Sequence, residues 1–177
     1  MTEEDIIQGC IKEKRQAQEA LYKKYAPKLL GLCCRYAKDM LEAEDILQEG
    51  FIKVFDNISS YSGKGSFEGW LKRIMINEAL NKIRARKEKL DFMDDFDFDV
   101  PTSILSTDTL HHKELLQILN RLPEGYRVVF NLFAIEGFSH QEIAEKLNIG
   151  HSTSRSQYAK ARNYLQKLIN EIEKVKL

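Results

Sequence analysis

The sequence predicts an all-α fold of two small helical domains joined by a flexible acidic linker. Apolar residues recur at helical spacing along residues 1–90 and again along 109–177. Between them, residues 91–108 keep no regular period, alternate acidic with aromatic side chains and include Pro101, as a linker does. The expected domains are therefore 1–90 and 109–177, the second with four helices that include a helix-turn-helix.

Length and composition suit small soluble domains with modest cores. The chain has 177 residues, of which 43% are hydrophobic and 31% are charged. No apolar run is long enough to cross a membrane, and the acidic N-terminus lacks the basic and apolar regions of a signal peptide. We therefore expect a cytoplasmic protein without membrane insertion.

The cysteines and histidines do not suggest a reactive centre. Cys10, Cys33 and Cys34 have neither metal-ligand spacing nor a nearby histidine. We expect them to be small buried apolar side chains, with redox sensing as the alternative. The histidines lack acids or cysteines at useful spacing, so we expect no enzyme, no metal site and no cofactor.

A formal net charge of zero conceals a separation of charge along the chain. Residues 91–110 contain no lysine or arginine, and their acids are Asp91, Asp94, Asp95, Asp97, Asp99 and Asp108. Without this segment both flanks are net basic, which is the local signature expected of a nucleic-acid-binding protein.

Two amphipathic helices are expected in the first half of the first domain. Leu21, Leu29 and Tyr36 lie on the apolar face of the first, which Pro27 is expected to kink or restart. The second covers about 41–56, and its apolar residues are Ile46, Leu47, Phe51, Val54 and Phe55. Its other face is polar and mostly acidic, which by composition alone indicates a solvated surface.

A Ser- and Gly-rich loop at 57–66 precedes the next helix, expected at about 67–87. The loop holds Tyr61 but lacks the spacing of a phosphate-binding loop, so a nucleotide site is rejected. On the helix, a polar strip at helical spacing consists of Arg73, Asn77, Asn81 and Arg84. An aromatic ring, amides and cations are what binding of unstacked bases requires, although a solvated basic helix is the simpler alternative.

Residues 137–168 predict a helix-turn-helix. Ser139 and Glu142 form a capping box at the start of its first helix, and Asn148, Ile149 and Gly150 make the turn. The second helix begins at about His151, and its core-facing stripe consists of Ser154, Tyr158, Ala161, Leu165 and Leu168. Two preceding helices are expected to support it: one in the helical pattern that resumes from about Thr109 and includes Leu115 to Leu122, and one opened by Pro123 and ended by Gly137.

The other face of this last helix is free of acids and carries small, hydroxyl-bearing and basic residues. They include Ser152, Arg155, Ser156, Ala159, Lys160 and Asn163. Small residues allow a helix to lie deep in the major groove, hydroxyl and guanidinium groups reach base edges, and Lys160 and Arg162 can neutralise phosphates. This pattern favours DNA binding over a merely solvated face on a helical bundle.

Four segments in this order resemble the sigma factors of bacterial RNA polymerase, specifically the short two-domain extracytoplasmic-function group of the sigma-70 family. They are AEDILQEGFIKVF at 43–55, the pattern F..WL.RI..N at 67–77, LPEGYRVVFNL at 122–132 and GFSHQEIAEKLNI...TSRSQYAKAR at 137–162. A stand-alone helix-turn-helix regulator acting as a dimer is the alternative, but it would explain only residues 109–177.

The resemblance implies a function for each domain. The first would bind the clamp of core RNA polymerase and melt the downstream, minus-ten promoter element, and the second would read the upstream, minus-thirty-five element as duplex. The linker would thread the polymerase interior. The implied partners are core RNA polymerase, through its clamp and flap regions, promoter DNA and an anti-sigma factor.

The same resemblance assigns site residues. Polymerase-binding residues would be Asp45, Gln48, Glu49, Lys53 and Phe55. Those at the downstream element would be Tyr61, Lys64, Arg73, Asn77 and Arg84. Those at the upstream element would be Ser152, Thr153, Arg155, Ser156, Gln157, Ala159, Lys160 and Arg162. The chain departs from the family where Gly150 replaces a frequent polar cap, where Gln157 and Ala159 replace bulkier or more basic residues, and where Asn81 replaces a common aspartate.

Overall fold

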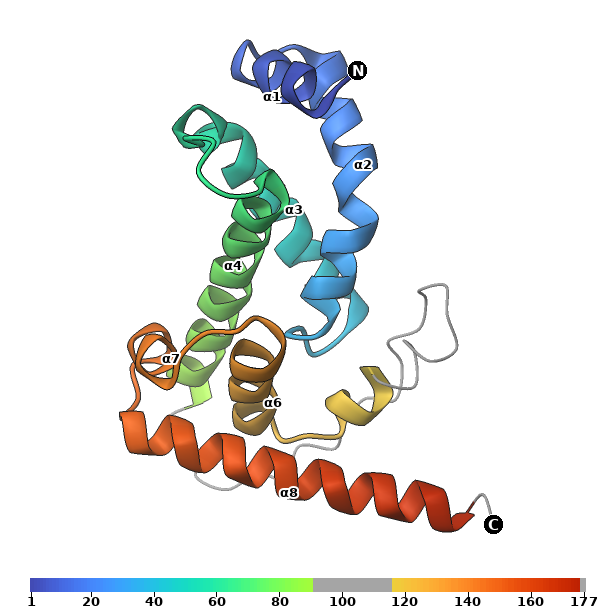
Figure 1. Cartoon of the computed structure of the whole chain (residues 1–177), viewed down its shortest axis with the longest axis vertical. Helices are drawn as coiled ribbons and strands as arrows, with labels where there is room; N and C mark the ends of the chain where they lie inside the picture. The colour runs from blue at the N-terminus through green and yellow to red at the C-terminus, as the bar shows by residue number, and fades with distance from the viewer. Residues whose placement is uncertain (91–115, 176–177) are drawn as a thin grey trace. The chain divides into compact units, whose positions relative to one another are not determined.

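The computed structural model describes residues 1–90 and 116–175, which form helices and their connecting turns (Figure 1). The chain divides into two compact units, Met1–Lys87 and Glu88–Leu177. Within the described residues no strand occurs, so the prediction of two all-α domains is confirmed. The expected linker at 91–108 lies outside the described residues, as do the first residues of the expected second domain.

The first unit consists of four α-helices and a short 3₁₀ turn (Figure 1). They are α1 (Glu3–Ile11), α2 (Arg15–Cys34), α3 (Met40–Asn57), η1 (Ile58–Ser60) and α4 (Phe67–Leu90). Thr2 and Asp5 cap α1 reciprocally, and the Asp39 side chain accepts from the Glu42 amide at the start of α3. Helix α2 passes through Pro27 as one element, so the expected restart does not occur.

The core of the first unit contains the apolar residues that helical spacing predicted. Leu21 and Leu29 of α2 are buried, and so is Tyr36, which lies in the turn after this helix. On α3 the buried residues are Ile46, Leu47, Phe51 and Val54, whereas Phe55 is half-buried. Cys10, Cys33 and Cys34 are buried as expected. Burial raises the pKa of Cys33 to about 12 and that of Cys34 to about 11, so both thiols stay protonated at neutral pH.

Met75 of α4 packs against Gly50 of α3, in the space that a side chain at position 50 would occupy. A Cβ atom at Gly50 would lie 2.2 Å from Sδ and 2.8 Å from Cε of Met75 on α4. Met75 is completely buried, so its side chain has little room to move away. The absence of a side chain at Gly50 therefore allows this packing between the two helices that carry most of the candidate site residues of this unit.

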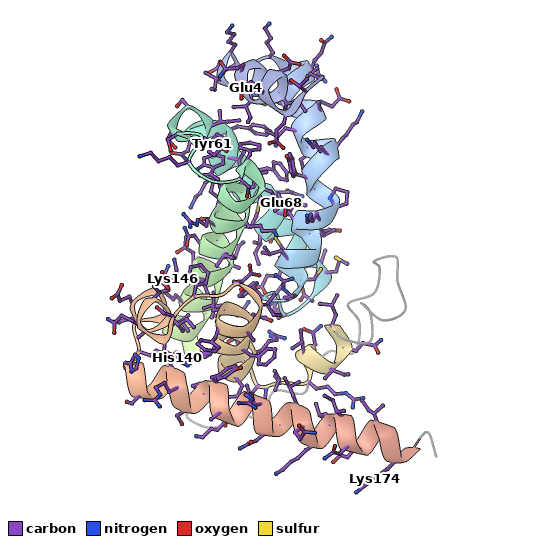
Figure 2. The ribbon with its side chains drawn as sticks, viewed as in Figure 1. Glu4, Tyr61, Glu68, His140, Lys146 and Lys174 are labelled. Carbon is purple, nitrogen blue, oxygen red and sulfur yellow. The ribbon has the colours of Figure 1, made fainter. Side chains whose placement is uncertain are left out.

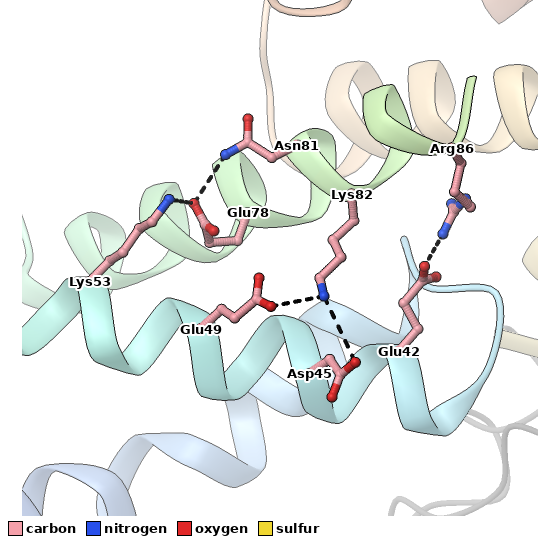
Figure 3. A network of polar contacts seen from close by, with 8 residues as sticks. All are labelled: Glu42, Asp45, Glu49, Lys53, Glu78, Asn81, Lys82 and Arg86. Atoms are coloured by element: carbon pink, nitrogen blue, oxygen red, sulfur yellow. Dashed lines mark hydrogen bonds and ion pairs between the residues drawn. The ribbon is translucent and has the colours of Figure 1, made fainter. Parts of the chain in front are cut away.

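Ion pairs follow the same helix contact along its solvent-facing side (Figure 3). Lys82 of α4 lies 3.0 Å from Glu49 and 3.8 Å from Asp45, both of α3. Arg86 pairs with Glu42 at one end of the row, and Lys53 lies 2.5 Å from Glu78 at the other. The acidic face expected on α3 is therefore partly neutralised by bases of α4.

The second unit contains α6 (Glu124–Phe130), η2 (Asn131–Ile135), α7 (His140–Leu147) and α8 (His151–Val175), and residues 116–120 before them are helical (Figure 1). Pro123 opens α6 as predicted, and η2 continues it as a π-helical turn. Gly137 follows with a φ of +79°, a left-handed conformation that glycine adopts without strain.

The predicted helix-turn-helix is formed by α7 and α8. Ser139 and Glu142 make the expected capping box, and Asn148 ends α7 in the left-handed conformation. On α8 the side chains of Ser154 and Ala161 are fully buried. Ala161 packs with Leu119 and Leu122, and Leu165 covers this cluster. The predicted core stripe of the last helix is thus confirmed.

We predict that Gly50→Ala is less stable than Gly31→Ala by about 1–3 kcal/mol, the usual cost of overpacking a core. Both changes give a helix the same gain in propensity, but Gly31 has no neighbour within 4 Å of the added Cβ. Urea unfolding followed by the fluorescence of Trp70, the single tryptophan, reports on the first unit. Equal stability of the two variants would show that the contact with Met75 relaxes without cost.

Candidate nucleic-acid and protein interfaces

The outer face of α8 is exposed along its first three turns. Its exposed residues are His151, Ser152, Thr153, Arg155, Ser156, Ala159, Lys160, Arg162 and Asn163. Helix residues at this spacing share a side of the helix, and none of these is acidic. The Arg162 guanidinium lies 6.0 Å from the ring centre of Tyr158, at the limit of a cation–π contact. The structure thus brings together most of the predicted upstream-element residues.

Gln157 is the exception, because it lies against α6. Its Oε1 atom is 3.4 Å from the position that a Cβ would occupy at Gly125, and the side chain is half-buried. The absence of a side chain at Gly125 gives Gln157 this space. Its use in contacting DNA would require the side chain to leave α6.

Packing between α7 and α8 fixes the direction of the exposed face. His140 Nδ1 lies 2.9 Å from Oγ of the buried Ser154, which joins the two helices of the motif. The imidazole stacks on Phe133, with ring centres 4.2 Å apart. Burial lowers the pKa of His140, and the nearby charges of His151 and Arg155 lower it further. A neutral His140 therefore holds the start of α8 at physiological pH.

The polar strip on α4 forms as predicted, with Arg73, Asn77, Asn81 and Arg84 all exposed. Asn81 Oδ1 accepts a hydrogen bond from Arg84 Nη2 at 2.5 Å. The amide nitrogen of Asn81 donates to Glu78 Oε1 at 3.2 Å. Sequence reasoning missed Glu78, because a lone acid beside a basic strip gives no signal until its partners are known.

The loop before α4 is ordered by its own tyrosine and glycines. The Tyr61 hydroxyl donates to the Gly65 carbonyl at 2.9 Å, and its ring packs against Phe67 and Trp70. Gly63 and Gly65 have φ values of 71° and 83°, which side-chain-bearing residues rarely adopt. This geometry leaves Tyr61 half-buried and the adjacent Lys64 exposed at the loop tip.

The outer face of α3 contains apolar residues that sequence reasoning missed. Leu41 is 75% exposed and Ile52 is 60% exposed. With Asp45 and Gln48 they follow the spacing i, i+4, i+7 and i+11, which places all four on one side of the helix. Leu41 and Ile52 do not belong to the predicted core stripe of this helix. Their position outside that stripe was the sequence signal that could have identified them as exposed apolar residues. We call these four residues the α3 outer face.

The predicted polymerase-binding residues divide between this face and the contact with α4. Gln48 is exposed on the outer face, whereas Glu49 and Lys53 are exposed but pair with α4 residues. Phe55 is half-buried, with its ring centre 6.0 Å from that of Phe51. Exposed apolar side chains beside polar ones are typical of a protein-binding surface.

Within residues 1–90 and 116–175, no three histidines, cysteines or acids are grouped closely enough to hold a metal ion. None of the helices in this part of the chain is long and apolar enough to cross a membrane.

Protein-family models match both halves of the chain. The model described as Sigma-70 region 2 matches residues 21–89, and that described as Sigma-70, region 4 matches residues 112–165. A stand-alone helix-turn-helix regulator would not account for the first match.

Curated relatives match along most of their length. The ECF RNA polymerase sigma factor SigW of Bacillus subtilis is 32% identical over 163 residues, which cover 84% of this chain and 86% of SigW. The RNA polymerase sigma-H factor of Pseudomonas aeruginosa is 28% identical over 184 residues, which cover 96% of this chain and 95% of the relative.

Solved structures share the fold. The sigma factor RpoE of Bartonella quintana, in complex with the anti-sigma factor NepR, matches with a TM-score of 0.58 and 23% identity over 86% of this chain and 96% of RpoE. CnrH, in complex with the cytosolic domain of CnrY, matches with a TM-score of 0.51 and 19% identity over 94% of this chain and 96% of CnrH. Together with the family models and relatives, these findings show that the chain belongs to the extracytoplasmic-function group of the sigma-70 family, the sigma factors that direct transcription initiation by RNA polymerase.

Proposed function

We propose that this sigma factor binds core RNA polymerase through α3, opens the minus-ten element at α4 and its preceding loop, and reads the minus-thirty-five element as duplex through α8. The observation that carries the proposal is the presence of one exposed, nucleic-acid-compatible helix face in each unit. Promoter recognition at two separate elements requires two such faces. Transcription from a defined promoter by core polymerase with and without the chain is its direct test.

The upstream element would be read by Arg155, Ser156, Ala159 and Lys160. Small Ala159 lets the helix approach the floor of the groove, and Arg155 can donate two hydrogen bonds to a guanine edge. Ser152, Thr153 and Arg162 flank them and can contact phosphates. Gln157 is left out of this set because its side chain packs toward α6.

We predict that Arg155→Ala or Lys160→Ala weakens binding to duplex promoter DNA by about 1–3 kcal/mol where the lost contact is to a base edge, and lowers the salt slope by roughly one where it is to a phosphate. Fluorescence anisotropy at several salt concentrations separates the two cases. Lys174→Ala is the matched control, because Lys174 is exposed near the other end of α8 (Figure 2). If a variant that carries both Arg155→Ala and Lys160→Ala binds duplex DNA like the unaltered chain, this face of α8 does not read DNA.

The downstream element would be held open by the α4 strip and the loop at 57–66. Asn77 would hydrogen-bond to a base taken out of the stack, Tyr61 would contact its ring, and Lys64, Arg73 and Arg84 would neutralise the backbone. Because the Tyr61 ring already packs on Phe67 and Trp70, a base would meet only its remaining surface.

We predict that Asn77→Ala and Tyr61→Ala reduce promoter opening while polymerase binding remains normal, since stacking contributes about 1–3 kcal/mol per base. Permanganate reactivity of downstream thymines measures the opening. Tyr61→Phe keeps the ring and loses the hydrogen bond to Gly65. Opening retained by Tyr61→Phe but lost in Tyr61→Ala would support a direct role of the ring, whereas equal losses would assign Tyr61 to the loop structure.

Core polymerase would dock on the α3 outer face. Leu41 and Ile52 supply apolar area, and Asp45 and Gln48 supply polar contacts that set the register. Glu49, Lys53 and Phe55 lie at the edge of this face. Replacing Asp45 and Glu49 together by basic residues would also break both ion pairs with Lys82. Loss of polymerase binding in that variant would therefore not report on docking alone.

We predict that Leu41→Glu with Ile52→Glu lowers the affinity for core polymerase at least tenfold, or about 1.4 kcal/mol, because two apolar contacts are replaced by charges. The fold should persist because both side chains are exposed. Ile11→Glu on α1 is the control for an exposed apolar residue outside the face. Unchanged affinity of the double variant would exclude the α3 outer face as the docking surface.

An anti-sigma factor is included among the proposed partners. The solved structure of RpoE is a complex with the anti-sigma factor NepR, and that of CnrH is a complex with the cytosolic domain of CnrY. A partner that covers Leu41 and Ile52 would compete directly with core polymerase, which is the simplest way to hold this chain inactive.

A further inference from the structure

A buried carboxylate lies inside the polar strip of α4. Glu78 is 5% exposed, although its neighbours Asn77 and Asn81 face solvent. Its Oε1 atom accepts from Lys53 Nζ of α3 at 2.5 Å and from Asn81 Nδ2 at 3.2 Å (Figure 3). A carboxylate removed from water is destabilising unless it is paired and hydrogen-bonded, and these two donors meet that requirement.

Glu78 decides which atom of Asn81 is presented to the outside. A carboxylate offers only acceptors, so the amide must direct its nitrogen toward Glu78 and its oxygen away from it. Figure 3 shows this orientation, with Oδ1 turned away from α3. That oxygen accepts from Arg84 Nη2 at 2.5 Å. If the amide turned over, it would present two N–H groups to a guanidinium, and the contact would be lost.

We infer that Glu78 is a positioning residue for promoter opening, which acts through the Asn81 amide on the Arg84 guanidinium. This inference rests on the proposed use of the α4 strip at the downstream element. Glu78 itself is buried beneath the strip, and Lys53 holds it from α3. Four side chains from two helices thus form a continuous chain of hydrogen bonds. Lys53 and Asn81 donate to Glu78, and Arg84 donates to Asn81.

Glu78→Gln tests the first step of this chain. Glutamine has the same shape but can donate as well as accept, so it no longer dictates the orientation of Asn81. A promoter is first selected from random-sequence duplex DNA by transcription with core polymerase and the unaltered chain. On this promoter, opening by core polymerase with the Glu78→Gln variant should be about tenfold lower than with the unaltered chain. Permanganate reactivity of thymines is the readout. Glu68→Gln is the matched control, because Glu68 also lies on α4 and pairs with Lys28 of α2.

A double-mutant cycle separates positioning from a general effect on stability. In an Asn81→Ala background there is no amide to orient, so Glu78→Gln should change opening by less than about twofold. The pairing of Glu78 with Lys53 is still lost in that background. A purely structural role would therefore give the same tenfold loss with or without Asn81.

Each outcome is decisive. A loss that depends on Asn81 supports the inference, and an equal loss in both backgrounds overturns it in favour of a structural role. The inference is also overturned if Glu78→Gln does not reduce opening, or if Asn81→Ala alone opens the promoter normally. In both cases the proposed function remains intact as long as the unaltered chain opens the promoter. If the unaltered chain with core polymerase opens no selected promoter, the proposed function itself fails.

Discussion

The close contact between α3 and α4 at Gly50 and Met75 is the constraint on which the first unit depends. Because Gly50 has no side chain, the Met75 side chain packs directly against α3, and polar residues of the two helices form ion pairs beside this contact. The candidate polymerase surface lies on α3 and the candidate strip for unstacked bases lies on α4. Their relative positions are therefore set by one helix contact, and a change in its spacing would disturb both surfaces together.

In the second unit, α8 is held by contacts on one side and is exposed on the other. A recognition helix must expose one side to DNA and still be held firmly by the other. On α8 the holding side contains a fully buried serine and alanine, which allow close packing, and His140 joins Ser154 through a hydrogen bond. The left-handed Asn148 ends α7 and begins the turn to α8, while the capping box at Ser139 fixes the start of α7. These contacts bury Ser154 and leave the neighbouring Arg155 exposed, so they do not cover the face proposed to bind duplex DNA.

Helical period predicted the parts of this architecture that depend on local sequence. The buried stripe of α3 and that of α8 followed from spacing, because burial of one side repeats with the turn of a helix. Pairings between helices could not be predicted in this way, since they depend on which residues the fold places opposite one another. Lys82 beside Asp45, and Gln157 beside Gly125, required the structure for this reason. Of the two outcomes expected at Pro27, a kink or a restart, the restart is wrong, because α2 continues through Pro27 as one helix despite the lost backbone hydrogen bond.

The distribution of charge around α4 shows how a protein with no net charge can expose cations on one side of a helix, as the proposed DNA binding requires. Lys82 and Arg86 face α3 and are paired with its acids, whereas Arg73 and Arg84 lie on the exposed strip. The acids of α3 thus offset one side of a basic helix and leave the other side positive. Pairs between packed helices are screened less by salt than exposed cations are. Moderate salt should consequently weaken the proposed contacts of the strip with DNA while the contact between α3 and α4 persists, which would separate the electrostatics of folding from those of DNA binding on one helix.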